Sequence, residues 1–151
     1  MHIAIGADHG GYELKQHIVE FLITQDHQVR DFGTHNAESV DYPDIASSVA
    51  RAVAAGEFER GILICGTGIG MSIAANKMRG ARAAVCTNSY MARMTRHDND
   101  ANILCLGGRV LGLGPALDIV QTFLDSEFLA GRHARRVGKI SALEKNTPEN
   151  Q

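Results

Sequence analysis

Residues 61–72 read Gly-Ile-Leu-Ile-Cys-Gly-Thr-Gly-Ile-Gly-Met-Ser, and this stretch decides the fold class. The apolar run Ile62–Ile64 is followed by three glycines within five residues, and then by the start of a helical pattern. A short continuous apolar run is typical of a parallel strand that is covered on both faces. The stretch therefore predicts a strand, a tight glycine-rich turn and a helix, which is the repeating unit of an α/β fold.

The same alternation of apolar runs and helical patterns extends along the whole chain. Strands are expected at His2–Ala7, Gln28–Phe32, Gly61–Cys65, Ala81–Cys86 and Ala101–Leu106. Helices are expected at Tyr12–Thr24, after Pro43 to about Val53, and at Met71–Met78, Tyr90–Arg96, Pro115–Phe123 and Val137–Leu143. We therefore predict an α/β fold with one Rossmann-like, doubly wound domain over residues 1–151. Its five-stranded parallel sheet should carry helices on both faces, and residues 146–151 should form a frayed tail.

The composition restricts the possible partners and location of the protein. The net charge of −2 argues against broad binding to nucleic acid or to an anionic membrane surface. The chain shows no signal-peptide pattern and no apolar run long enough to span a bilayer. The three cysteines lie in apolar runs, which fits reduced thiols in a cytoplasmic protein. The seven histidines show no ligand spacing, so we expect no metal site.

Ligands of doubly wound sheets bind at the carboxyl ends of the strands, and the loop Gly66–Gly70 follows one such end. Its glycines allow a tight turn with outward N–H groups, which favours an anion site, although a turn without a ligand would look the same. It is not a dinucleotide fingerprint, because the third glycine would fall at Met71. It is not a P-loop either, because no Gly-Lys-Ser/Thr sequence follows.

Cys65 occupies the last strand position before this loop. Neighbouring N–H groups would favour its thiolate, so Cys65 is either a base or nucleophile, or a buried structural residue. We interpret Cys86 and Cys105 as structural. Asp8 and His9 close the first strand at the same edge, where they could hold a sugar hydroxyl and a phosphate. Asp8 could also cap the helix that begins near Tyr12.

Two polar segments occur later in the chain. Arg132 and Arg136 are four residues apart, so in a helix they would share one face and could clamp a phosphate. A solvated basic face is the alternative. The segment Arg96–Asp100 is expected, from its composition alone, to be a solvated loop between a helix and the fifth strand.

Together these segments resemble the ribose-5-phosphate isomerase B family, with its allose- and galactose-6-phosphate isomerase relatives. The resemblance extends from Ile3 to about Leu143. It rests on Gly6–His9, Glu38–Pro43, Cys65–Lys77, Asn99–Asn102 and Gly131–His133, of which Cys65–Lys77 is the most specific. It implies an aldose–ketose isomerase that needs no cofactor and acts on a small phosphosugar. The interconversion of ribose 5-phosphate and ribulose 5-phosphate is expected, with a 6-phosphohexose isomerase or a noncatalytic sugar-phosphate-binding protein as the alternatives.

The resemblance also implies roles for individual residues. Cys65 would remove the proton from C2 of the open-chain sugar, and Thr67 would assist ring opening. The amides of the Gly66–Gly70 loop would stabilise the enediolate, and Asp8 would hold sugar hydroxyls. Phosphate binding is implied for His9, Arg132 and Arg136, and other ligand contacts for Gly66, Gly68, Ile69, Gly70, Asn99 and Arg109. The assembly would be a homodimer or a dimer of dimers, with active sites built from two subunits.

The chain departs from the family pattern at one position. Aligned on Asn99, the family usually has a histidine that opens the furanose ring, whereas this chain has Asp98. The nearest histidine, His97, lies one residue earlier. An ionised carboxylate is a poor proton donor at neutral pH, so His97, Asp98 and Thr67 are all candidates for ring opening.

Overall fold

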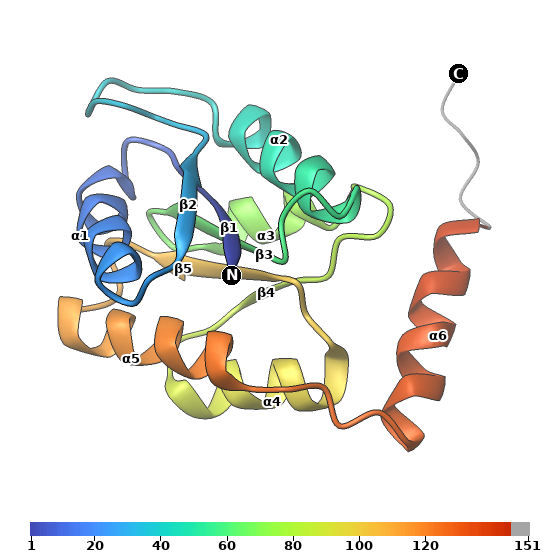
Figure 1. Cartoon of the computed structure of the whole chain (residues 1–151). Helices are drawn as coiled ribbons and strands as arrows, with labels where there is room; N and C mark the ends of the chain where they lie inside the picture. Colours follow the sequence, from blue (N-terminus) through green and yellow to red (C-terminus); the bar gives the residue numbers. More distant parts are fainter. Residues whose placement is uncertain (146–151) are drawn as a thin grey trace.

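A parallel sheet forms the centre of the computed structural model, which describes residues 1–145 (Figure 1). The strands are β1 (His2–Ala7), β2 (Gln28–Asp31), β3 (Arg60–Cys65), β4 (Ala83–Val85) and β5 (Ile103–Gly107). The helices are α1 (Tyr12–Thr24), α2 (Tyr42–Ala54), α3 (Ile69–Ala75), α4 (Ser89–Asn99), α5 (Leu113–Asp125) and α6 (Arg132–Lys145). The frayed tail predicted at residues 146–151 lies outside the described residues.

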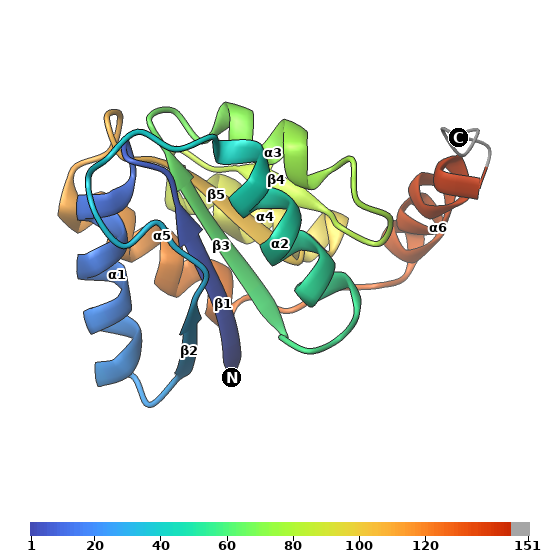
Figure 2. The same cartoon turned by 90° about the horizontal axis from the view of Figure 1, so that it is seen from above.

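The sheet has the order β2-β1-β3-β5-β4, and every pair of neighbouring strands is parallel. Helices α1, α4 and α5 pack on one face, where Ile18, Ile64 and Phe123 are buried together. Helices α2 and α3 pack on the other face around Val49 and Leu63. Figure 1 shows the sheet between these two helical layers, and Figure 2 shows the strands side by side from above. The predicted doubly wound α/β fold is confirmed.

Several element boundaries differ from the sequence-based expectation, and two of the differences have a clear physical cause. Strand β4 has only three residues, because Arg82 N–H donates to the Asn102 side chain at 2.8 Å instead of joining the sheet. Helix α4 extends to Asn99, so the prediction of a solvated loop at Arg96–Asp100 was wrong. Arg96 is 3% exposed and donates to Asp100 and to the Ala101 carbonyl. These two acceptors replace water as the hydrogen-bond partners of its guanidinium group.

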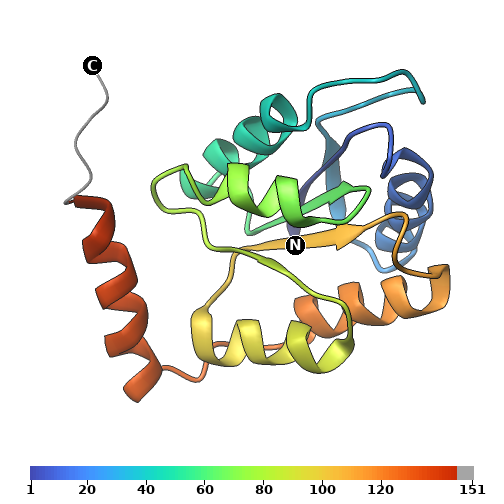
Figure 3. The ribbon, with the colours of Figure 1, turned by 180° about the vertical axis from the view of Figure 1, so that it is seen from behind.

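Helix α6 stands apart from the two layers (Figure 1). None of its residues is buried, and it begins at Arg132 rather than at the predicted Val137. Glu144 near its end accepts a hydrogen bond from Gly80 N–H at 2.9 Å, at the loop that leads into β4. In Figure 3 the arrow of β5 points away from α6, so this helix lies beyond the amino ends of the strands.

The loop after β1 passes so close to β3 that only glycine fits at Gly11. A Cβ atom at this position would lie 2.5 Å from the carbonyl oxygen of Ile64. Gly11 N–H bonds back to the Asp8 carbonyl at 3.1 Å, which closes the turn before α1. The close approach brings the first two site residues, Asp8 and His9, next to the end of β3.

We predict that Gly11→Ala destabilises the protein by about 1–3 kcal/mol, because the methyl group forces the loop after β1 away from β3. Gly114→Ala is the matched control, since a Cβ at Gly114 in α5 has nothing within 4 Å. That control should be neutral or stabilising by up to about 1 kcal/mol. Urea denaturation of both variants measures the difference, and equal stabilities would contradict the proposed close packing.

Candidate active site

The carboxyl ends of β1, β3 and β5 border a cleft of about 470 Å³. Its lining comprises Asp8, Tyr42, Cys65, Gly66, Thr67, Ile69, Gly70, Ile73 and Arg109. The residues come from the loops that follow three neighbouring strands, from the start of α2 and from α3. The structure therefore brings together the sequence-predicted residues at this edge of the sheet.

Cys65 ends β3 and is 5% exposed at the wall of the cleft. Its sulfur accepts a hydrogen bond from Gly68 N–H at 3.1 Å. Gly68 has a φ of +80°, a left-handed conformation that favours glycine, and this turn directs its N–H group back to the thiol. A donor in this position stabilises negative charge on sulfur, as a catalytic base requires.

The other two cysteines have environments that disfavour ionisation. Burial raises the pKa of the Cys86 thiol to about 11. Burial also raises the pKa of Cys105 well above its ordinary value, with a further contribution from the neighbouring Cys65 and Cys86. Both thiols therefore remain protonated near neutral pH, which suits structural residues.

Asp8 follows β1 and is 7% exposed. Its Oδ1 atom accepts a hydrogen bond from Gly10 N–H at 2.9 Å. The alternative role of helix cap was wrong, because Gly11 is the N-cap of α1 and no side chain caps that helix. The Asp8 carboxylate is held by its own turn instead, and it faces the cleft beside Cys65.

His9 lies in an adjoining cleft of about 580 Å³ that shares Arg109 with the first. Its lining comprises His9, Gly10, Glu13, Leu14, His17, Gly108, Arg109, Leu111 and Leu113. The Nδ1 atom of His9 accepts a hydrogen bond from Val40 N–H at 3.3 Å. This contact assigns the proton of the neutral ring to Nε2, which leaves Nε2–H as a donor for a ligand oxygen.

Sequence reasoning missed Tyr42 as a site residue. Its ring packs against the glycine-rich loop so closely that a Cβ at Gly70 would lie 2.8 Å from the ring. Tyr42 is 40% exposed, so it covers part of the cleft wall while remaining accessible. The available signal was its position before Pro43, because a helix that opens there places its first residue at the carboxyl edge of the sheet.

The remaining predicted residues lie at the opposite edge of the sheet. His97, Asp98 and Asn99 end α4, which runs from the carboxyl end of β4 toward the amino end of β5. Arg132 and Arg136 are exposed in the first turns of α6, beyond the same edge (Figure 3). Within one chain, the structure therefore does not bring these residues together with the Cys65 cleft.

Asp98 and Asn99 contact other groups at that edge. Asp98 Oδ1 lies 3.4 Å from His133 Nε2 at the start of α6. Asn99 lines a separate cleft of about 450 Å³ between the amino ends of the strands and α6, together with Ile140 and Glu144. These contacts join the end of α4 to α6, so the two elements present their polar residues as one surface.

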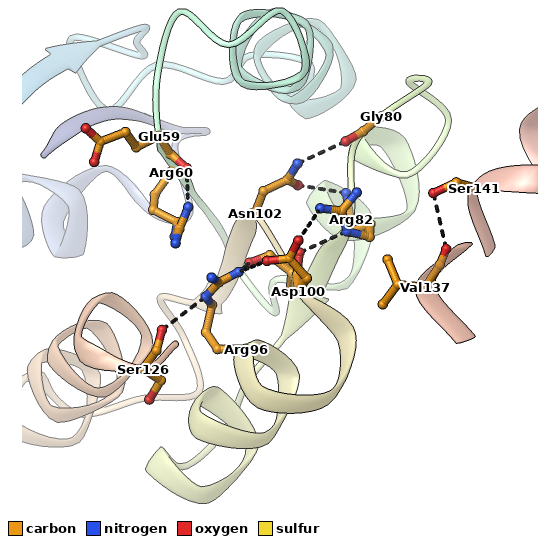
Figure 4. A network of polar contacts seen from close by, with 11 residues as sticks. Glu59, Arg60, Gly80, Arg82, Arg96, Asp100, Asn102, Ser126, Val137 and Ser141 are labelled. Atoms are coloured by element: carbon orange, nitrogen blue, oxygen red, sulfur yellow. Dashed lines mark hydrogen bonds and ion pairs between the residues drawn. The ribbon is translucent and has the colours of Figure 1, made fainter. Parts of the chain in front are cut away.

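A partly buried polar network fixes the end of α4 (Figure 4). Asp100 accepts from Arg96 at 2.8 Å and from Arg82 at 3.1 Å. Asn102 bonds to the backbone on both sides of Ala81, which ties the start of β5 to the loop before β4. Burial, with a repulsive contribution from Arg96, lowers the pKa of the neighbouring Arg60. The network holds Asn99 at a fixed place.

Residues 1–145 contain no group of three or more His, Cys, Asp or Glu side chains that could hold a metal ion. Within the same residues, no helix is both long and apolar enough to cross a bilayer.

The chain is similar to known proteins over most of its length. Residues 3–140 match the family model described as Ribose/Galactose Isomerase. Ribose-5-phosphate isomerase B of Escherichia coli is 50% identical, over 95% of this chain and 96% of its own length. D-erythrulose-4-phosphate isomerase of Pectobacterium atrosepticum is 43% identical, over 94% of each chain. The solved structure of Clostridium thermocellum ribose-5-phosphate isomerase B has a TM-score of 0.96 and 65% identity, over 97% of this chain and 99% of its own.

We predict that iodoacetamide at pH 8 alkylates Cys65 at least about tenfold faster than Cys86 or Cys105. With a pKa of about 11, only about one Cys86 thiol in a thousand is ionised at that pH. Cys65, in contrast, faces the cleft and receives an N–H donor. Peptide mass spectrometry over time measures the three rates, and equal rates would contradict the assignment of Cys65 as the reactive thiol.

Proposed function

This chain belongs to the ribose/galactose isomerase family, and on that premise we propose that it interconverts ribose 5-phosphate and ribulose 5-phosphate with Cys65 as the base. Family membership confirms the resemblance drawn from the sequence motifs. The proposal rests on the position of the Cys65 sulfur. It accepts a hydrogen bond from Gly68 N–H and lies in the same cleft as the Asp8 carboxylate. This arrangement offers a base and hydrogen-bonding groups where a small polar ligand can reach them.

In the proposed reaction, the Cys65 thiolate removes the proton from C2 of the open-chain aldose. The electron pair left on C2 forms a double bond to C1, and the C1 oxygen takes the negative charge of the enediolate. N–H groups of the Gly66–Gly70 loop stabilise this charge, because they are aligned before it develops. The hydroxyl proton on O2 is transferred to O1, and Cys65 returns the abstracted proton to C1 as the C2–O bond becomes the carbonyl of the ketose. The overall step therefore requires no oxidant or reductant.

A second copy of the chain would complete the site. The base lies at the carboxyl edge of the sheet, whereas Arg132 and Arg136 lie beyond the amino edge on α6. Both arginines are exposed and occupy one face of the observed helix, as phosphate binding would require. We propose a homodimer in which the α4 and α6 surface of one chain faces the Cys65 cleft of the other. The substrate phosphate would then bind between Arg132, Arg136 and His9.

Asp98 is a poor candidate for ring opening. Its carboxylate oxygen Oδ1 lies 3.4 Å from His133 Nε2 and can accept a hydrogen bond from that ring. A carboxylate in this state accepts protons rather than donating them to the ring oxygen. We therefore assign ring opening to His97 or to Thr67, whose hydroxyl accepts from Ile69 N–H at 3.3 Å within the cleft.

A second question is how many carbon atoms the phosphosugar substrate contains. The family description includes galactose isomerases, and one relative is named for a four-carbon phosphosugar. All these substrates share an open-chain carbonyl at C1 or C2 and a terminal phosphate. Steady-state turnover of four-, five- and six-carbon phosphosugars distinguishes them, and a chain inactive on all of them would be a sugar-phosphate-binding protein.

Replacement of the base is the simplest test of the chemistry. Cys65→Ala should retain the fold but lower kcat on ribose 5-phosphate by at least about 10²-fold, because it removes the only base that the mechanism uses. Cys86→Ala is the matched control, since it removes a buried thiol from the other face of the sheet, and it should keep activity. Wild-type turnover by Cys65→Ala would exclude Cys65 as the base.

The shared site makes a separate prediction. Cys65→Ala and Arg132→Ala are each expected to be defective as homodimers. A heterodimer of the two, isolated through different affinity tags, contains one site with both native residues. Its activity should therefore be about half that of the wild-type dimer. A heterodimer as inactive as its parents would show that Cys65 and Arg132 serve the same site from one chain.

A further inference from the structure

Lys15 is a charged residue buried in the first turn of α1. Its side chain is 0% exposed, and Nζ donates to both carboxylate oxygens of Asp31 at 2.8 Å. Nζ also donates to the carbonyl oxygen of Thr34. All three hydrogens of the ammonium group therefore have acceptors. The resulting contacts connect α1 to the end of β2 and to the start of the loop that follows it.

This loop reaches the candidate active site at both of its ends. At its start, Ala7 N–H donates to the Gly33 carbonyl at 2.7 Å, and Thr34 N–H donates to Ala7 O at 2.5 Å. Ala7 directly precedes Asp8. At its other end, Val40 N–H donates to Nδ1 of His9 at 3.3 Å. Tyr42, which lines the cleft, follows two residues later. Residues 35–41 thus span from the Lys15 contact to the His9 ring.

Stability alone does not explain a lysine at this position. Burial of an ammonium group has a large desolvation cost, and an apolar side chain of similar volume often stabilises a fold as well or better. The neighbouring positions Leu14, Ile18 and Leu22 already supply the apolar face of α1. An apolar residue would fill the same space but would leave the Thr34 carbonyl without the Lys15 donor and the Asp31 carboxylate with only the Gly33 N–H, which donates to Oδ1 at 2.8 Å. The lysine therefore adds a directional link to the loop.

We propose that Lys15, paired with Asp31, is a positioning residue that holds the 33–40 loop so that Val40 fixes the His9 ring. The inference rests on the proposed function, because it assigns to His9 the role of a phosphate contact. With Nδ1 occupied by Val40, the ring presents Nε2–H to a phosphate oxygen in one orientation. Loss of the link would release the loop and leave the ring free to rotate and to change its tautomer.

The position of Cys65 and Asp8 should depend less on this link. Asp8 N–H donates to the Ile64 carbonyl at 3.1 Å, which ties it to β3 independently of the loop. A failure of the Lys15 link should therefore weaken binding of the phosphate more than it slows proton transfer. This split separates a positioning role from a general loss of structure.

The test compares Lys15→Met, the double variant Lys15→Met/Asp31→Asn, and Leu22→Ala. The double variant removes the carboxylate that Lys15→Met leaves unpaired, so it recovers stability without restoring the link to Thr34. Leu22→Ala destabilises the same helix through a core cavity and touches no part of the loop. For each, kcat, KM for ribose 5-phosphate, and competitive inhibition by inorganic phosphate are measured. The tautomer of His9 is followed by ¹⁵N NMR of the imidazole nitrogens.

Both lysine variants should raise KM and the inhibition constant of phosphate by about tenfold, with kcat changed by less than about threefold. Their His9 nitrogens should shift from a single tautomer toward a mixture, whereas Leu22→Ala should keep the wild-type KM and spectrum. Lysine variants with a wild-type KM and His9 spectrum would overturn the proposal. If Lys15→Met does not fold, the double variant carries the same test. If the wild type isomerises no phosphosugar, the proposed function fails, and the His9 spectra still decide the positioning role.

Discussion

Backbone hydrogen bonds between the loops at the carboxyl edge of the sheet determine how the site is built. Asp8 N–H bonds to the Ile64 carbonyl, and Gly108 N–H bonds to the Cys65 carbonyl at 2.7 Å. Arg109 N–H bonds to the Gly66 carbonyl at 3.0 Å. Because these hydrogen bonds join the loops after β1, β3 and β5, no side chain separates the three loops. Residues far apart in the sequence therefore project into one cleft at positions fixed by the sheet.

The chain separates the two tasks of a phosphosugar isomerase in space. In the proposed mechanism, proton transfer belongs to the carboxyl edge, where the Gly68 N–H donates to the Cys65 sulfur. The cationic residues suited to a phosphate lie on α6 beyond the amino edge, where solvent reaches them. A sheet whose strands are about 15–20 Å long cannot bring these two edges together within one chain. In the proposed homodimer, the same separation accounts for the position of α6 outside the body of the fold, because its polar face would serve the second copy rather than its own sheet.

The sequence was sufficient for features that depend on local pattern. The apolar runs identified all five strands, and the glycines after Cys65 identified the loop that faces its sulfur. Features that depend on distant partners were beyond it. Arg96 was expected in a solvated loop because the groups that help to bury it, the Ser126 carbonyl and the Phe123 ring, lie about thirty residues later in the chain. Lys15 gave no signal, since a lysine next to an apolar stripe is normally solvated, and its acceptors lie on a different strand. The sequence also could not show that the candidate site residues form two separate groups, one at the Cys65 cleft and one at the end of α4 and the start of α6.

The central claim is that one substrate molecule lies between two chains, with its carbonyl end at Cys65. A crystal structure of the Cys65→Ala variant soaked with ribose 5-phosphate tests this most directly. The account predicts an open-chain sugar with C2 facing residue 65 of one chain, and a phosphate contacted by His9 of that chain and by Arg132 and Arg136 of the other. A sugar bound entirely within one chain, or one whose C2 points away from residue 65, would contradict it.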